Sequence, residues 1–129
     1  MFYLDTSAAV KLVVAERGTT ALLHWVSERQ DRIVSSDLLR TELQRATRRG
    51  APQHMGRARS VLESITVMTM VRSTFERAAE LEPELLRSLD ALHLAAALEL
   101  GDDLEGIVTY DDRLAEAAHH YGIDVFAPR

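Results

Sequence analysis

The chain has 129 residues, of which 47% are hydrophobic and 27% are charged, as is ordinary for one globular domain with its own core. It contains no cysteine, which excludes disulfides and thiolate metal sites and fits a reducing cytoplasm. The net charge of −5 argues weakly against nucleic-acid binding. However, arginines dominate residues 40–59 and acids dominate residues 76–105, so we expect a basic face on an otherwise acidic surface.

The beginning of the chain predicts neither export nor membrane insertion. In "MFYLDTS" no basic residue precedes the acid at position 5, unlike the start of a signal peptide. No apolar run along the chain is long enough to span a membrane. We therefore expect a soluble cytoplasmic protein.

Strands and helices are predicted to alternate along the chain. Short apolar or β-branched runs predict strands at residues 1–5, 32–36, 65–71, 106–110 and 124–127. Helical patterns predict helices at residues 6–16, 19–30, 37–49, 53–64, 73–81, 88–100 and 111–122. This alternation is typical of the α/β class, in which helices cover both faces of a parallel sheet.

The helix predicted at residues 88–100, "SLDALHLAAALEL", is apolar on every side and is therefore expected to be buried. It nevertheless contains Asp90, although an ionised carboxylate is rarely buried without a partner. Ser88 is the expected cap of this helix, and an acid in its first turn gains from the helix dipole. His93, one turn further on the same face, is expected to be a packed core histidine.

Three further acids lie where a parallel sheet would gather them. Asp5 ends the first predicted strand, Glu42 lies early in the helix after the second, and Asp111 follows the fourth. Sites in such sheets form at the carboxyl ends of the strands, so these acids and Asp90 are expected to converge. Taken singly, Asp5 and Asp111 are also explained as helix N-caps, and Glu42 as a solvated acid paired with Arg45.

Four carboxylates held close together would repel one another and drive each other towards protonation. A divalent cation removes that conflict, and oxygen donors without thiols favour Mg²⁺ or Mn²⁺ over zinc. Two such ions about 3.5–4 Å apart can activate a water and stabilise the leaving oxygen of a phosphodiester. A metal ion is therefore the expected partner of Asp90.

Four motifs in this order and spacing, "YLDTSAAVKL", "RTEL", "LDALHLAAAL" and "VTYDDRLAEAA", resemble PIN-domain proteins. The likeness is strongest to VapC-type ribonuclease toxins of bacterial type II toxin–antitoxin pairs, and it covers essentially the whole chain. It implies a single PIN domain over residues 1–129, folded as a three-layer α/β/α sandwich around a central parallel sheet. The implied activity is Mg²⁺- or Mn²⁺-dependent endonucleolytic cleavage of RNA, often transfer or ribosomal RNA.

The resemblance also assigns roles to residues. Asp5 and Asp90 would be the main metal ligands, Glu42 would bind metal or position the water, and Asp111 would support a second ion. The hydroxyl residues that would orient these acids are Thr6, Ser7 and Thr109. Asp112 follows Asp111 where relatives commonly carry a basic or polar residue, and is either a substitute ligand or an extra first-turn acid.

The partners implied by the resemblance are RNA, a second copy of the chain and an antitoxin. Such toxins are usually homodimers held inactive by a VapB-type antitoxin, whose C-terminal tail often inserts an arginine into the acidic site. Arg45 and Arg49 lie on roughly the same helix face as Glu42 and are candidates to bind RNA phosphates. A solvated face or an antitoxin contact explains these two arginines equally well.

Two other functions stay open at this point. One is a PIN nuclease that acts in nucleic-acid maintenance rather than growth arrest, and the other is a noncatalytic binding module. The small size of the chain favours the toxin over the maintenance nuclease. The complete set of four acids opposes the noncatalytic module.

Overall fold

A parallel sheet runs through the centre of the molecule. The computed structural model describes all 129 residues and contains five strands in the order β3-β2-β1-β4-β5, with every neighbouring pair parallel. The strands are β1 (Phe2–Leu4), β2 (Ile33–Ser36), β3 (Thr66–Met68), β4 (Gly106–Val108) and β5 (Val125–Phe126). The predicted α/β class is therefore confirmed, with β1 at the centre of the sheet.

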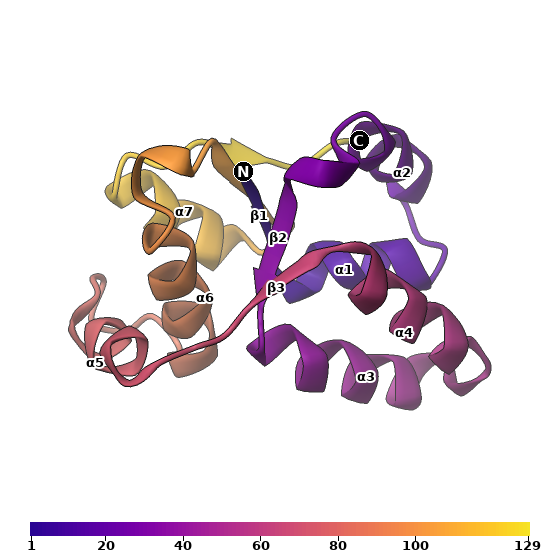
Figure 1. The fold of residues 1–129 in the computed structure, drawn as a ribbon, viewed down its shortest axis with the longest axis horizontal. Helices are drawn as coiled ribbons and strands as arrows, with labels where there is room; N and C mark the ends of the chain where they lie inside the picture. Colours follow the sequence, from indigo (N-terminus) through magenta and orange to yellow (C-terminus); the bar gives the residue numbers. More distant parts are fainter.

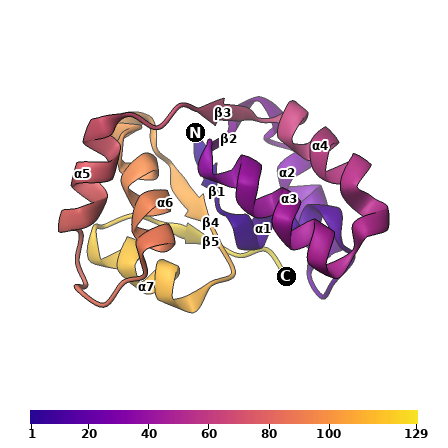
Figure 2. The same cartoon turned by 90° about the horizontal axis from the view of Figure 1, so that it is seen from below.

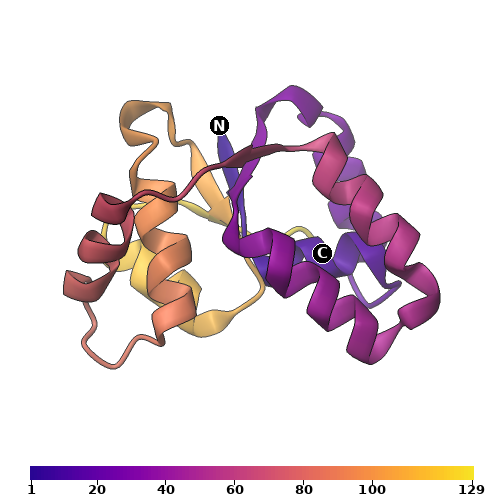
Figure 3. The same cartoon turned by 60° about the horizontal axis from the view of Figure 1, so that its bottom comes forward.

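The helices form two layers, one on each face of the sheet (Figures 1 and 2). On one face lie α1 (Thr6–Val13), α2 (Thr19–Ser27), α3 (Leu38–Gly50) and α4 (Met55–Ser64). On the other lie α5 (Arg72–Glu80), α6 (Ser88–Leu98) and α7 (Asp112–His120). The chain changes face once between β3 and α5, where it crosses the sheet edge (Figure 3). No helix is long and apolar enough to cross a membrane.

Alternation along β1 divides the core into two parts. The side chains of Phe2 and Leu4 join the apolar cluster beneath α1–α4. Tyr3, between them, joins the cluster beneath α6 and α7. This follows from strand geometry, in which successive side chains point to opposite faces. Since Asp5 follows directly after β1, its carboxylate is placed by a segment that is buried on both faces.

Several helices and strands are shorter than predicted, or are capped differently. Helix α1 ends at Val13, before the residues up to 16 predicted as helical, and β3 ends at Met68. The N-cap of α6 is Arg87, so Ser88 is the first residue of the helix and not its cap. The prediction that α6 is buried all round also fails at Leu89, which is 49% exposed. The other faces of α6 pack against the sheet and α5, and they bury most of the alanines.

Candidate active site

Asp5 lies at the carboxyl end of β1 and is held from several directions. It is only 4% exposed, and its Oδ1 accepts hydrogen bonds from the Ser7 hydroxyl at 2.7 Å and from the Ala8 amide at 3.0 Å. Its Oδ2 accepts from the Thr109 hydroxyl, at the end of β4, at 2.6 Å. Burial raises the pKa of Asp5, although these hydrogen bonds act in the opposite direction. Asp5 is therefore both the N-cap of α1 and a desolvated acid at the sheet edge.

Glu42 projects from the first half of α3 towards the same edge. Its Oε1 accepts hydrogen bonds from the Thr6 hydroxyl at 2.7 Å and from His93 Nε2 at 2.6 Å. Burial acts to raise the pKa of Glu42, but the hydrogen bonds from His93 and Thr6 outweigh it, and the pKa is lowered. Glu42 forms no ion pair with Arg45, so the interpretation of Glu42 as a solvated acid paired with Arg45 does not hold.

Asp90 and Asp111 share one cationic partner. The Arg87 guanidinium lies 3.3 Å from Asp90 Oδ2 and 3.2 Å from Asp111 Oδ2. Burial and the nearby Asp111 carboxylate raise the pKa of Asp90, and Arg87 offsets only part of this. Asp111 also caps α7, because its Oδ1 accepts from the amides of Arg113 and Leu114. The N-cap interpretation is therefore correct for Asp111, as it is for Asp5, and both acids also lie at the carboxyl ends of their strands.

The hydroxyl residues connect these acids across the sheet edge. Ser7 Oγ donates to Asp5 and accepts from the Tyr110 amide at 2.9 Å. Thr109 Oγ1 donates to Asp5 and accepts from the Asp111 amide at 3.1 Å. The ends of β1 and β4, and the starts of α1 and α7, are thereby fixed relative to each other.

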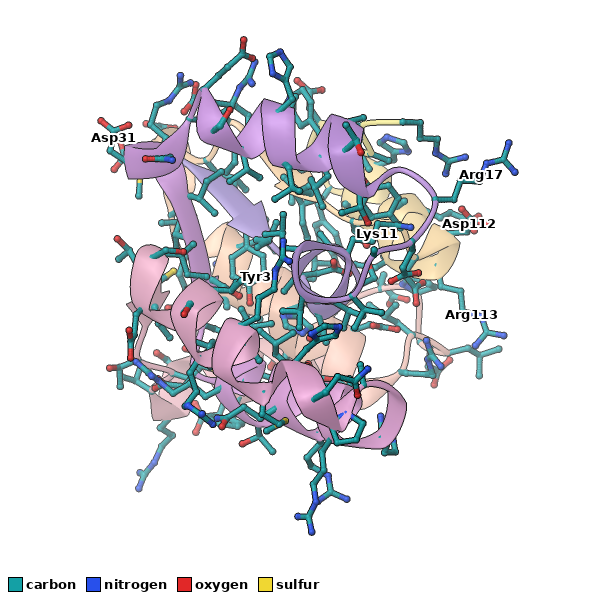
Figure 4. The ribbon with its side chains drawn as sticks, turned by 90° about the vertical axis from the view of Figure 1, so that its right-hand side faces the viewer. Tyr3, Lys11, Arg17, Asp31, Asp112 and Arg113 are labelled. Atoms are coloured by element: carbon teal, nitrogen blue, oxygen red, sulfur yellow. The ribbon has the colours of Figure 1, made fainter.

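The other candidates lie outside this network. Asp112 is exposed in the first turn of α7 and makes no hydrogen bond or ion pair through its side chain. Arg45 and Arg49 are exposed on α3 and, with Arg48, line a small surface hollow. In Figure 4, Asp112, which follows β4, lies on the opposite side from Asp31, which precedes β2. The residues after β4 therefore lie at the opposite end of the sheet from those that precede β2.

The comparison with known families agrees with this arrangement. The family model for the PIN domain matches residues 2–120 of this chain, a range that includes all four acids. The chain belongs to the PIN-domain family.

Among curated proteins, this PIN domain is similar to three ribonucleases of Mycobacterium tuberculosis. It is 41% identical to Ribonuclease VapC35 over 134 residues, which cover 99% of this chain and 97% of the relative. It is 40% identical to Ribonuclease VapC46, with 98% and 96% covered, and 36% identical to Ribonuclease VapC47, with 99% and 97% covered.

A solved structure shows the same fold. The crystal structure of Mycobacterium tuberculosis VapC20, described as a sarcin–ricin loop cleaving toxin, superposes with a TM-score of 0.80. The match covers 99% of this chain and 100% of that one, at 15% sequence identity. The likeness confirms the three-layer sandwich and extends over the whole chain.

The donor set of the PIN domain fits a divalent cation of the magnesium type. All four acids offer oxygen, and no thiol is present. As the side chains stand, however, no three acidic or histidine residues form a preassembled metal cage. The Arg87 guanidinium bridges Asp90 and Asp111 in the way a bound cation would. A metal-binding arrangement therefore requires Arg87 to move away from these carboxylates.

Two residues of this PIN domain site are not predicted from the sequence. Arg87 lies three residues before Asp90, a spacing that places both side chains on one face of the helix start and is the only sequence signal of their ion pair. His93 was expected to be a packed core residue. It is indeed buried at 2% exposure, yet its Nε2 contacts Glu42, 51 residues away. Its spacing from Asp90 was the only signal of this role.

Proposed function

We propose that this chain is an Mg²⁺- or Mn²⁺-dependent endoribonuclease that acts as the toxin of a type II toxin–antitoxin pair. The observation that carries the proposal is the convergence of Asp5, Glu42, Asp90 and Asp111 at the carboxyl edge of a PIN-domain sheet. The full-length likeness to three proteins named Ribonuclease VapC supports RNA as the substrate and a toxin as the biological role.

The roles we propose for the acids follow from their surroundings. Asp5 and Asp90 would hold the metal, which would supply an activated water and neutralise charge on the scissile phosphate. Glu42, the acid whose pKa is lowered, stays ionised to orient the water or to bind metal. Asp111 would support a second ion, and its Oδ2 is the oxygen that the capping of α7 leaves for this, since Oδ1 accepts from the backbone amides.

We also propose roles for the hydroxyl residues, for Asp112 and for two surface arginines. Ser7 and Thr109 orient Asp5, and Thr6 orients Glu42. We assign Asp112 as an extra first-turn acid rather than a ligand, because its side chain is exposed and contacts no partner. Arg45 and Arg49 are proposed to bind RNA phosphates along α3.

The proposed partners are those of the toxin family: a second copy of the chain and a VapB-type antitoxin with an arginine in its tail. The bridge that Arg87 makes between Asp90 and Asp111 supports this mode of inhibition, because a guanidinium already fits between these carboxylates. Purified chain analysed by light scattering, alone and with the product of a neighbouring antitoxin gene, tests both assemblies.

The first experiment is cleavage of total bacterial RNA by the purified chain with Mn²⁺, with Mg²⁺ and with EDTA, followed by mapping of the new 5′ ends. We expect discrete cuts that need the metal and disappear in Asp90→Asn, which keeps the side-chain shape but removes the charge. A matched control is Asp31→Asn, an exposed acid at the opposite edge of the sheet (Figure 4), which should cleave as the wild type does.

The other outcomes favour one of the two alternatives or contradict the mechanism. Cuts in structured DNA or in a processing intermediate, without growth arrest on expression, would favour a maintenance nuclease. A folded wild type that binds Mn²⁺ but cleaves neither RNA nor DNA would favour a noncatalytic binding module. Cleavage that persists in both EDTA and Asp90→Asn would contradict the metal-dependent mechanism itself.

A further inference from the structure

A buried chain of hydrogen bonds leads from the end of β2 to Glu42. Tyr3 Oη donates to Ser36 Oγ at 2.8 Å and is also hydrogen-bonded to His93 Nδ1 at 2.8 Å. On the other side of the ring, His93 Nε2 donates to Glu42 Oε1 at 2.6 Å. Ser36 and Tyr3 are fully buried, and His93 is 2% exposed. One imidazole thus links the interior of the sheet to a carboxylate of the site.

The two oxygens of the Glu42 carboxylate differ in their hydrogen bonds. Oε1 accepts from both His93 Nε2 and the Thr6 hydroxyl, which fills the two lone-pair directions of that oxygen. No protein group donates to Oε2. The carboxylate is therefore fixed in one orientation with one oxygen free for a ligand.

The same imidazole joins two helices that carry separate acids. Glu42 comes from α3, on one face of the sheet, whereas His93 and Asp90 come from α6, on the other face. Asp90 and His93 are three residues apart and lie on one side of α6. The contact between His93 and Glu42 therefore holds the two helices, and with them two acids, at a set separation.

Packing alone does not require a histidine here. The four residues that follow His93 on α6, Leu94 to Ala97, are apolar and buried, and an apolar side chain at position 93 would avoid the penalty of burying two polar nitrogens. In this structure both nitrogens have partners, so the penalty is offset. The two hydrogen bonds of the ring therefore explain why this position holds a histidine.

We propose that His93 is a positioning residue, which fixes the orientation of Glu42 and its distance from Asp90. Its effect on cleavage rests on the proposed function, but its effect on metal binding does not. Groups that orient metal-binding side chains typically change affinity or activity 10- to 100-fold when they are removed. We expect an effect of about that size.

Two substitutions separate the roles of the two ring nitrogens. In His93→Gln the amide nitrogen can replace Nε2 and still donate to Glu42. In His93→Asn the amide nitrogen replaces Nδ1, so Glu42 no longer receives this hydrogen bond while the Tyr3 side keeps a partner. We expect His93→Asn to lower kcat about 10- to 100-fold with little change in KM for RNA. His93→Gln should recover most of this loss.

Mn²⁺ binding, measured by titration calorimetry without RNA, tests positioning independently of cleavage. The affinity should fall in His93→Asn and be largely restored in His93→Gln, while the two melting temperatures in EDTA stay close to each other. If the wild type binds Mn²⁺ in this pattern but cleaves no RNA, the proposed function fails and the positioning role stands. Equal losses of kcat and Mn²⁺ affinity in both variants would overturn the positioning role.

Tyr3→Phe keeps the test decisive if His93→Asn does not fold. It leaves Glu42 and His93 unchanged and removes the oxygen that is hydrogen-bonded to both His93 Nδ1 and Ser36 Oγ. We expect a smaller fall in kcat and Mn²⁺ affinity in the same direction, again with KM unchanged. A Tyr3→Phe protein that is less stable but has unaltered kcat and Mn²⁺ affinity would show that the chain of hydrogen bonds serves folding only.

Discussion

At the scale of single residues, Asp111 and Glu42 each use one carboxylate oxygen for hydrogen bonds that fix the side chain in the fold. Asp111 caps α7 through Oδ1 and faces Arg87 through Oδ2. Glu42 is held through Oε1 and leaves Oε2 free. Asp90 differs from both, because it caps no helix and meets only Arg87 in addition to a repelling neighbour. The negative charge of Asp90 is therefore expected to contribute less to folding stability than the charge of Asp111 or Glu42.

We predict that Asp90→Asn stabilises the metal-free protein. Burial and Asp111 raise the pKa of Asp90 above its value in the unfolded chain, so its ionisation lowers stability as the pH rises through the folded pKa. The gain from asparagine is thus present at pH 7 and disappears as the pH falls towards the unfolded value of about 3.9. In EDTA at pH 7 we expect the melting temperature to rise by about 2–4 °C.

A suitable control for this prediction is Asp112→Asn, another acid in a first helix turn, which is exposed and has no acidic partner in contact. It loses the same favourable interaction with a helix dipole without relieving repulsion, so its melting temperature should fall slightly or stay unchanged. A fall in Asp90→Asn as well would mean that the ion pair with Arg87 outweighs the burial and repulsion.

At the scale of elements, the start of α6 combines the attractive and the repulsive groups of the site. Arg87 at the N-cap reaches both Asp90, on its own helix, and Asp111, at the start of α7. Its side chain is 59% exposed, so it can move into solvent without unpacking the core. Under the proposed function, this freedom would let a metal ion replace the guanidinium at the beginning of α6.

We predict that Arg87→Gln binds Mn²⁺ more tightly than the wild type. The ion must displace two ion pairs, each worth about 0.2–1 kcal/mol when exposed to solvent, and their sum corresponds to a gain of about 2- to 30-fold in affinity. Titration calorimetry at low ionic strength measures it. Arg113→Gln removes an equal charge from an exposed position on α7 (Figure 4) and should show a smaller gain. Weaker binding in Arg87→Gln would instead make Arg87 a group that organises the acids.

At the scale of the whole molecule, positive charge lies beside an acidic edge in a chain with a net charge of −5. One surface hollow, of about 280 Å³, is lined by Arg45, Arg48 and Arg49 of α3. Another, of about 560 Å³, includes Lys11, Arg17 and Arg129 beside Tyr110. Lys11 and Arg17 appear in Figure 4 on the same side as Asp112. An RNA strand that reaches the acids can therefore meet cations on more than one side.

We predict that the double variant Arg45→Gln/Arg49→Gln binds single-stranded RNA with a weaker salt dependence. Removing one arginine–phosphate ion pair should reduce the slope of log Kobs against log salt by about 0.7, hence by about 1.4 for two. Fluorescence anisotropy in EDTA measures binding without cleavage. Arg72→Gln/Arg77→Gln, with two exposed arginines on α5, is the matched control and should keep the wild-type slope. An unchanged slope in the α3 variant would assign Arg45 and Arg49 to solvent or to an antitoxin interface.

The sequence by itself determined the alternation of strands and helices, the parallel sheet and the edge at which the acids gather. These depend on neighbours within a few residues: the apolar run before Asp5, the cap that Asp111 provides, and the glycine that follows α7. Because the carboxyl ends of parallel strands share one edge, the placement of Asp5 and Asp111 followed from their positions in the chain alone.

Only the tertiary structure decided which distant parts of the chain these acids meet. The contact of His93 with Glu42 spans 51 residues, and that of Thr109 with Asp5 spans 104. Both depend on the strand order β3-β2-β1-β4-β5 and on how α3 and α6 approach the sheet from opposite faces. The ion pairs of Arg87 likewise depend on α6 and α7 starting side by side. Hydrophobic spacing reports which face of a helix is buried, but the partner across that face is fixed only when separate elements pack together.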